Sequence, residues 1–88
     1  MREARVEEKL RKKVEAAGGF CLKYPGNLFA GFPDRILLLP GGRIVLVELK
    51  APGRKPSPIQ RLVHRKLAAI GFPVLVIDTL EKVEAFEI

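Results

Sequence analysis

Three charged side chains stand at the ends of two predicted strands, where they could do chemistry. Asp34 directly precedes one apolar run, and Glu48 and Lys50 close the next one. Residues two apart on a strand project to the same face of a sheet, so Glu48 and Lys50 should lie side by side. Two carboxylates beside an ammonium group could hold a divalent cation and steer a water molecule.

The turn between the two strands decides whether Asp34 joins this group. A three-residue turn over Pro40 to Gly42 would place Asp34 directly opposite Glu48. A two-residue turn would shift the register by one and move Asp34 to the other face. Only the first arrangement gathers both carboxylates and the ammonium group of Lys50 at one strand end.

The pattern resembles the PD-(D/E)xK nuclease superfamily and, within it, the viral replication and repair nuclease (VRR-Nuc) family. The residues that carry the resemblance are Glu7, Gly31-Phe32-Pro33-Asp34, Glu48-Leu49-Lys50 and Gln60. A Pro-Asp followed by Glu-x-Lys is weakly specific alone, but all four elements in this order and spacing are strongly specific. The resemblance covers nearly all 88 residues, so we expect one domain over 1–88, in the stand-alone form of the family.

The resemblance implies a metal-dependent deoxyribonuclease that leaves 5′-phosphate ends. Its cofactor would be Mg²⁺ or Mn²⁺, held by Asp34, Glu48 and the backbone carbonyl of Leu49. Such hard cations prefer oxygen ligands and keep several waters. Glu7 would be an auxiliary ligand of the metal or of its water. On a helix predicted over 3–17, Glu7 shares a face with apolar positions, but it could instead pair with Arg11 or Lys23.

Two further residues would complete the catalytic set, and each has a structural alternative. The resemblance implies that Lys50 orients or activates the attacking water, whereas a plain salt bridge to an acid is the alternative. It also implies that Gln60 contacts phosphate or metal-bound water. Ser57 and Gln60 equally fit a capping box, in which the glutamine side chain bonds the Ser57 N–H. His64, a lone histidine among basic residues, is interpreted as a surface residue.

The charge of the chain favours a polyanionic partner. The net charge is +6, and six basic residues with no acidic one lie from Lys50 to Lys66. A charge run alone is more often an ordinary solvated face, but its position next to the carboxylates favours nucleic acid. The residues expected to bind DNA are Lys23, Arg54, Lys55, Arg61 and Arg65.

The chain is apolar for its size. Hydrophobic residues make up 48% of it, and the mean hydropathy is +0.11. A chain this short buries only roughly 60–65% of its unfolded surface, so either the core is dense or part of it is covered by a partner subunit. Leu28 and Phe29, in a loop rich in Gly and Pro, favour the partner and hence a homodimer.

The resemblance extends to a substrate. Stand-alone members resemble Holliday-junction resolvases, and a dimer with two active sites about a two-fold axis suits a symmetric four-way junction. Two alternatives remain: a nuclease of ordinary duplex DNA, and a non-catalytic nucleic-acid-binding module with a nuclease fold. The intact set of Asp34, Glu48 and Lys50 argues against the second, because binding alone needs no acids beside phosphate. The family name suggests a phage origin.

The remaining residue types exclude several protein classes. A single cysteine, Cys21, excludes an intramolecular disulfide, and no Cys/His arrangement fits zinc. Cys21 is interpreted as a small core residue. No apolar run approaches the ~20 residues of a membrane span, and no signal-peptide pattern is present, so we expect a cytoplasmic protein.

The elements that must position these residues follow an αβββαβ order, which predicts an α/β domain with a mixed sheet flanked by helices. The second strand of the hairpin, over 43–50, is apolar on both faces, as in a central strand covered on both sides. The expected elements are a helix over 3–17, strands over 20–24, 34–39 and 43–50, a helix from Pro58 to Gly71 with an apolar stripe (Ile59, Leu62, Val63, Leu67, Ile70), a buried strand over 72–77, and a short closing helix over 80–86.

Overall fold

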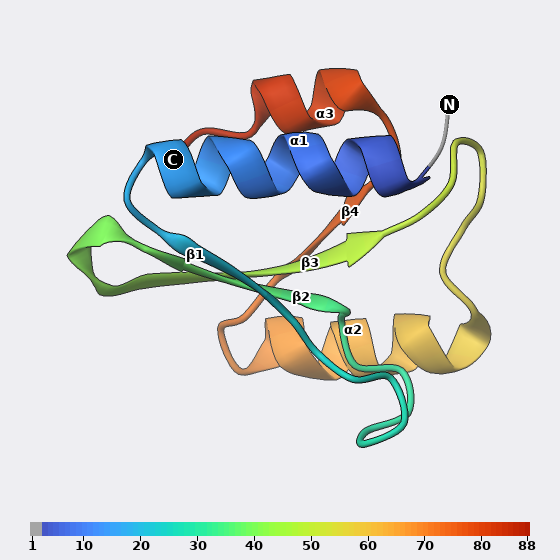
Figure 1. The fold of residues 1–88 in the computed structure, drawn as a ribbon. Coiled ribbons are helices and arrows are strands. Elements are labelled where there is room, and N and C mark those ends of the chain that lie inside the picture. Colours follow the sequence, from blue (N-terminus) through green and yellow to red (C-terminus); the bar gives the residue numbers. More distant parts are fainter. Residues whose placement is uncertain (1–2) are drawn as a thin grey trace.

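The structure is a computed structural model that describes residues 3–88. Its helices and strands confirm the predicted order and the α/β class (Figure 1). They are α1 (Glu3–Ala16), β1 (Phe20–Lys23), β2 (Arg35–Leu39), the 3₁₀ turn η1 (Pro40–Gly42), β3 (Arg43–Leu49), α2 (Pro58–Ala69), β4 (Val74–Ile77) and α3 (Leu80–Ala85).

The four strands form one mixed sheet in the order β1-β2-β3-β4. The first three strands are antiparallel, and β4 runs parallel to β3 after the crossover through α2. The prediction that 72–77 is a buried strand is wrong in two respects. The strand begins only at Val74, and it has a neighbour on one side only, so Leu75 is exposed and Ile77 alone is buried.

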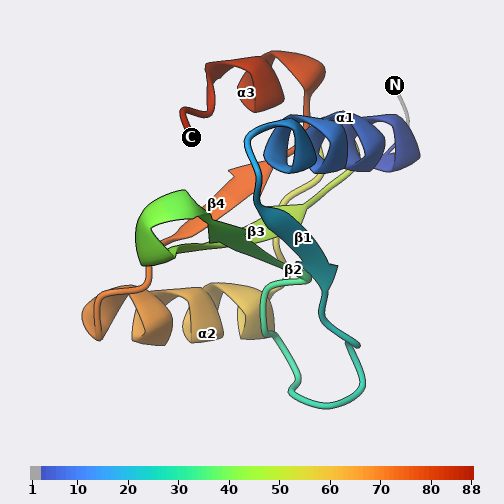
Figure 2. The same ribbon diagram turned by 60° about the vertical axis from the view of Figure 1, so that its left-hand side comes forward.

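Helices cover both faces of the sheet. In both views α1 and α3 lie on one side and α2 on the other (Figures 1 and 2). The hydrophobic core fills the layer between α1, α3 and the sheet, and α2 contributes no residue to that cluster. Cys21 packs partly buried against this core, as predicted, and burial raises the pKa of its thiol. Lys13 fastens α1 to α3, because its ammonium group donates to the carbonyls of Val83 and Glu84 at 2.8 and 2.9 Å.

The hairpin turn settles the register that the site depends on. Three residues, Pro40–Gly42, separate the paired residues Leu39 and Arg43. The same register pairs Arg35 with Val47, so the next step along both strands places Asp34 opposite Glu48. The three-residue turn is therefore confirmed, and it keeps Asp34 on the same face as Glu48.

The helix α2 begins as predicted but packs differently. Ser57 and Gln60 form the capping box, and Pro58 occupies the first turn. Of the predicted apolar stripe only Val63 is buried, whereas Ile59, Leu62 and Ile70 are exposed. The second half of β3 is covered on both faces, as predicted, but its first half is not, and Ile44 is 49% exposed. Among residues 3–88 no helix is long and apolar enough to cross a membrane.

Candidate functional site

The structure brings Asp34, Glu48 and Leu49 together at the ends of β2 and β3. The Asp34 carboxylate accepts a hydrogen bond from the backbone N–H of Leu49 at 3.1 Å. This bond holds the carboxylate beside Leu49, the residue whose backbone carbonyl was predicted to bind metal. The Glu48 side chain is only 3% exposed and faces α2, and the Asp34 side chain is partly exposed. One strand end therefore carries a buried acid and an accessible one.

Side chains from β3 and α2 surround the Glu48 carboxylate. Lys50 Nζ lies 3.6 Å from Glu48 Oε2, and Gln60 Nε2 donates to the same oxygen at 3.3 Å. The Gln60 side-chain oxygen also accepts from the Ser57 N–H at 2.8 Å. The capping-box interpretation of Gln60 is therefore confirmed. The other end of its amide contacts Glu48, the predicted catalytic acid, and its contact with phosphate or metal-bound water stays a prediction. Lys50 forms an ion pair with Glu48, which was the structural alternative for this residue. The ion pair leaves its predicted contact with the attacking water possible.

His64 is not the surface residue that the sequence indicated. Its side chain is 12% exposed, and its Nε2 lies 3.7 Å from Glu48 Oε1. His64 follows Gln60 by four positions, so the helix presents both on one face. That spacing was the signal available in the sequence. Burial, and then the charge of Lys50, lower the pKa of His64, which favours the neutral imidazole.

Arg35 was missed by the sequence analysis and connects Glu7 to the site. Its guanidinium is buried and forms a close ion pair with Glu7. The same group donates to the Asp34 carbonyl at 2.9 Å and lies 3.6 Å from the Asp34 carboxylate. The expectation that Glu7 would pair with Arg11 or Lys23, if it did not bind metal, is therefore wrong. The alternation of a strand sends Arg35 to the face that α1 covers, and this could have been deduced.

The residues at the strand end suit a hard cation with few protein ligands. No group of three His, Cys, Asp or Glu side chains in residues 3–88 is placed to hold a metal by itself. Two carboxylates on one face and the Leu49 carbonyl remain, and each carboxylate oxygen can accept more than one contact. Mg²⁺ fits such a site, because it is commonly bound by one or two carboxylates and keeps several waters.

Basic residues lie next to the carboxylates. Lys50, Arg54 and Lys55 line one hollow of about 240 Å³ together with Ala51. Arg61 donates to the Pro56 carbonyl at 2.7 Å, which ties the loop before α2 to the helix. The side chains predicted to bind DNA (Lys23, Arg54, Lys55, Arg61 and Arg65) are all exposed.

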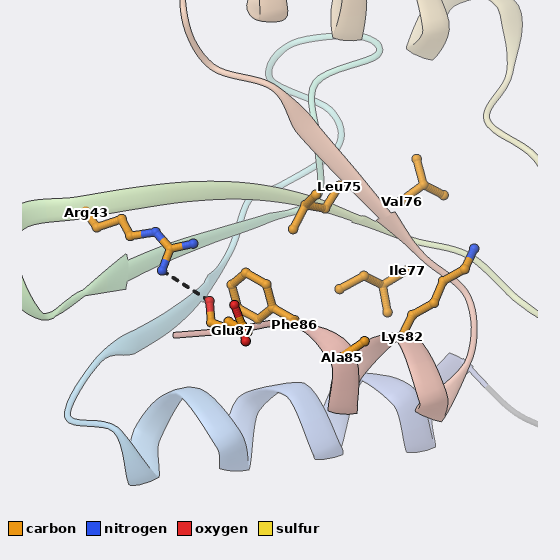
Figure 3. A pocket seen from close by; sticks show the side chains of 8 residues that line it. All are labelled: Arg43, Leu75, Val76, Ile77, Lys82, Ala85, Phe86 and Glu87. Carbon is orange, nitrogen blue, oxygen red and sulfur yellow. Dashed lines mark hydrogen bonds between the residues drawn. The ribbon is translucent and has the colours of Figure 1, made fainter.

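A larger hollow of about 480 Å³ lies elsewhere, between β4 and the C-terminal segment (Figure 3). Arg43 closes one end, where it donates to the Glu87 carbonyl at 3.1 Å. Leu75, Ile77 and Phe86 line much of the rest. None of the predicted catalytic residues reaches this hollow, so it is separate from the carboxylate site.

Comparison with known proteins agrees with the fold. No family model matches the sequence. A solved structure described as "VRR_NUC domain" superposes with a TM-score of 0.87 at 32% identity, covering 94% of this chain and 90% of that one. The protein therefore has the fold of the VRR-Nuc domain. The chain belongs to the VRR-Nuc family. It is also 42% identical over 79 residues to "Putative nuclease p44" of Acyrthosiphon pisum secondary endosymbiont phage 1, covering 90% of this chain and 85% of the relative.

Proposed function

We propose that this protein is a metal-dependent endonuclease that hydrolyses phosphodiester bonds in DNA. The observation that carries the proposal is the placement of Asp34 opposite Glu48, with Lys50 beside Glu48, at one end of the sheet. Membership of the VRR-Nuc family and a relative named as a nuclease support it. A binding module would gain nothing from two acids where phosphate must approach.

Asp34, Glu48 and the Leu49 carbonyl would hold Mg²⁺ or Mn²⁺. When bound, the cation would polarise the phosphoryl oxygen and offset the charge that develops there. Arg35 and the Leu49 N–H fix the position of Asp34. Lys50 orients the attacking water and stabilises negative charge, and Gln60 holds Glu48. Glu7, whose carboxylate is engaged by Arg35, would act as an auxiliary group at the edge of the site.

The basic hollow beside the site would receive the DNA backbone. Lys50, Arg54 and Lys55 line it, and Lys50 connects it directly to Glu48. The exposed Arg61 and Arg65 on α2 would extend the contact along the same chain segment.

DNA binding should therefore weaken steeply with salt. Each phosphate that the protein neutralises adds about −0.9 to the slope of log K against log salt concentration. Charge reversal of Arg54, Lys55 and Arg61 together should flatten that slope by roughly 2 to 3. The measurement is a fluorescence-anisotropy titration of labelled duplex at several salt concentrations, with chelator present to stop cleavage.

The matched control reverses Arg11 and Lys12, two exposed basic residues of α1. This variant should keep the wild-type slope. If it loses the salt dependence while the triple variant keeps it, DNA lies along α1 and not at the hollow. Lys13 is left unchanged, because its ammonium group holds the carbonyls at the end of α3.

An uncovered apolar face supports a homodimer. Phe20, Leu38 and Ile44 are paired across β1, β2 and β3 in one row, and all three are exposed. On another part of the surface, a groove of about 510 Å³ runs between the loop and α2, lined by Phe29, Leu62 and Ile70 among others. Patches of this kind mark interaction sites, and a two-fold dimer can cover the same patch on both copies.

The protein should accordingly be a dimer at micromolar concentration, with twice the chain mass of 9.8 kDa in light scattering. Ile44→Lys should shift it toward the monomer, because it would bury an ammonium group in the contact. Ile88→Lys is the control: it also changes an exposed isoleucine, but at the end of the chain after α3. A wild-type monomer at this concentration would overturn the dimer.

Two active sites about a two-fold axis would suit a branched DNA with the same symmetry. We therefore expect the dimer to prefer a four-way junction and to nick two strands at symmetric positions. The test is cleavage of end-labelled four-way, flap, nicked and linear duplexes in Mg²⁺ or Mn²⁺. Equal rates on all four would leave the nuclease in place but make ordinary duplex DNA its substrate.

A further inference from the structure

We infer that His64 is a positioning residue that fixes the orientation of the Glu48 carboxylate. The inference rests on the proposed function, since it concerns the acid that this function makes catalytic. It adds a second residue of α2 to the site, one helical turn after Gln60. His64 is not among the residues that carry the family resemblance.

The two residues of α2 approach different oxygens of the same carboxylate. Gln60 Nε2 donates to Glu48 Oε2 at 3.3 Å, and His64 Nε2 lies 3.7 Å from Glu48 Oε1. His64 Nε2 is fully buried and has no hydrogen-bond partner within the described residues. Buried nitrogens of this kind are normally hydrogen-bonded, so a small rotation that brings Nε2 onto Oε1 would satisfy it.

The contact explains how a nearly buried carboxylate keeps one orientation. Lys50 Nζ lies 3.6 Å from Oε2 of Glu48, the oxygen that Gln60 also contacts. Donors on one oxygen alone leave the terminal torsion of a glutamate free to swing, because that torsion is broad. A donor on the second oxygen fixes the plane of the carboxylate. His64 Nε2 is itself buried, so substrate cannot reach it, and its effect must pass through Glu48.

The test compares His64→Gln with His64→Asn. The glutamine amide nitrogen can occupy the position of imidazole Nε2, whereas the asparagine amide is one methylene shorter and cannot reach Glu48. Both replacements are polar and uncharged, so they differ mainly in reach. Loss of a group that orients a metal ligand typically costs 10- to 100-fold in metal affinity or activity. Ala69→Gln, an exposed change on the same helix, serves as the control.

We expect His64→Asn to lower kcat by about 10- to 100-fold with an unchanged KM for DNA. It should also weaken Ca²⁺ binding in calorimetry, a readout that needs no turnover. His64→Gln should recover both to within a few-fold of wild type. Wild-type kcat and Ca²⁺ affinity in His64→Asn would overturn the inference. Equal losses in both variants with lowered melting temperatures would also overturn it, in favour of a packing role.

The same measurements distinguish an error about His64 from an error about the nuclease function. If the wild type itself neither cuts DNA nor binds Ca²⁺, the nuclease proposal is lost and His64 with it. If the wild type does both and only the contrast between the glutamine and asparagine variants is missing, the nuclease stands and His64 alone is reassigned.

Discussion

Asp34→Asn and Glu48→Gln should each abolish DNA cleavage while leaving DNA binding intact or tighter. Each change keeps the shape of the side chain but removes a negative charge that repels phosphate and attracts the cation. In the Asp34→Asn variant the amide oxygen could still accept the Leu49 N–H bond, so the strand ends should stay paired. Loss of one preorganised electrostatic group costs on the order of 100- to 1000-fold in rate. Single-turnover cleavage and anisotropy titrations in chelator measure the two effects separately.

Glu8→Gln provides the matched control for these variants. Glu8 is an exposed acid of α1 whose nearest basic partner, Lys12, lies 4.0 Å away. The Glu8→Gln variant loses the same single negative charge, but outside the site, so its cleavage rate should equal that of wild type. Normal cleavage by either variant would remove the substituted residue from the active site, and normal cleavage by both would overturn the proposed site.

Gly31→Ala should destabilise the fold by about 2–4 kcal/mol. Gly31 has a φ of +83°, which side-chain-bearing residues rarely adopt. An added Cβ would also lie 2.7 Å from the Ile59 carbonyl oxygen and 2.9 Å from Val63 Cγ2, both on α2. The loop before Asp34 therefore packs directly on α2, and the glycine of the motif serves this close approach. Urea unfolding measures the loss in the free energy of unfolding.

Gly41→Ala separates the two causes. Gly41 has the same φ of +83° in the hairpin turn, but no atom lies within 4 Å of its added Cβ. This variant should lose only the backbone contribution, about 1–2 kcal/mol. The difference between the two variants then reports the contact of Gly31 with α2. Equal losses would mean that the loop and α2 are not in close contact.

Turn, strand and capping patterns among neighbouring residues were enough to predict how the strands and the helix position the site. The Pro-Gly-Gly turn sets the register of β2 and β3, because glycines at positions 41 and 42 adopt the positive φ values that the turn needs. The alternation of β3 then places Glu48 and Lys50 on one face. The capping residues Ser57 and Pro58 fix where α2 begins and hence where Gln60 stands. Each of these predictions needs only neighbours in the sequence.

Contacts between distant segments were beyond the sequence. Strand alternation could have placed Arg35 on the face that α1 covers, but no local pattern brings Glu7 of α1 to that end of β2, where Arg35 contacts both Glu7 and Asp34. His64 was assigned to the surface because its neighbours are basic, although the face it shares with Gln60 is turned toward Glu48. The apolar stripe of α2 was expected in the core, yet the main cluster forms on the opposite side of the sheet. Periodicity identifies an apolar face but not what covers it.

The most direct test of the nuclease account is cleavage of DNA by the wild-type protein with and without a divalent cation. End-labelled four-way, flap, nicked and linear DNAs, together with an RNA of matched sequence, would be incubated in Mg²⁺, in Mn²⁺ and in chelator. The account predicts cuts in Mg²⁺ or Mn²⁺ that stop in chelator. If no nucleic acid in the panel is cut in a metal-dependent way, the nuclease function is wrong, and the chain is a binding module that keeps the fold alone.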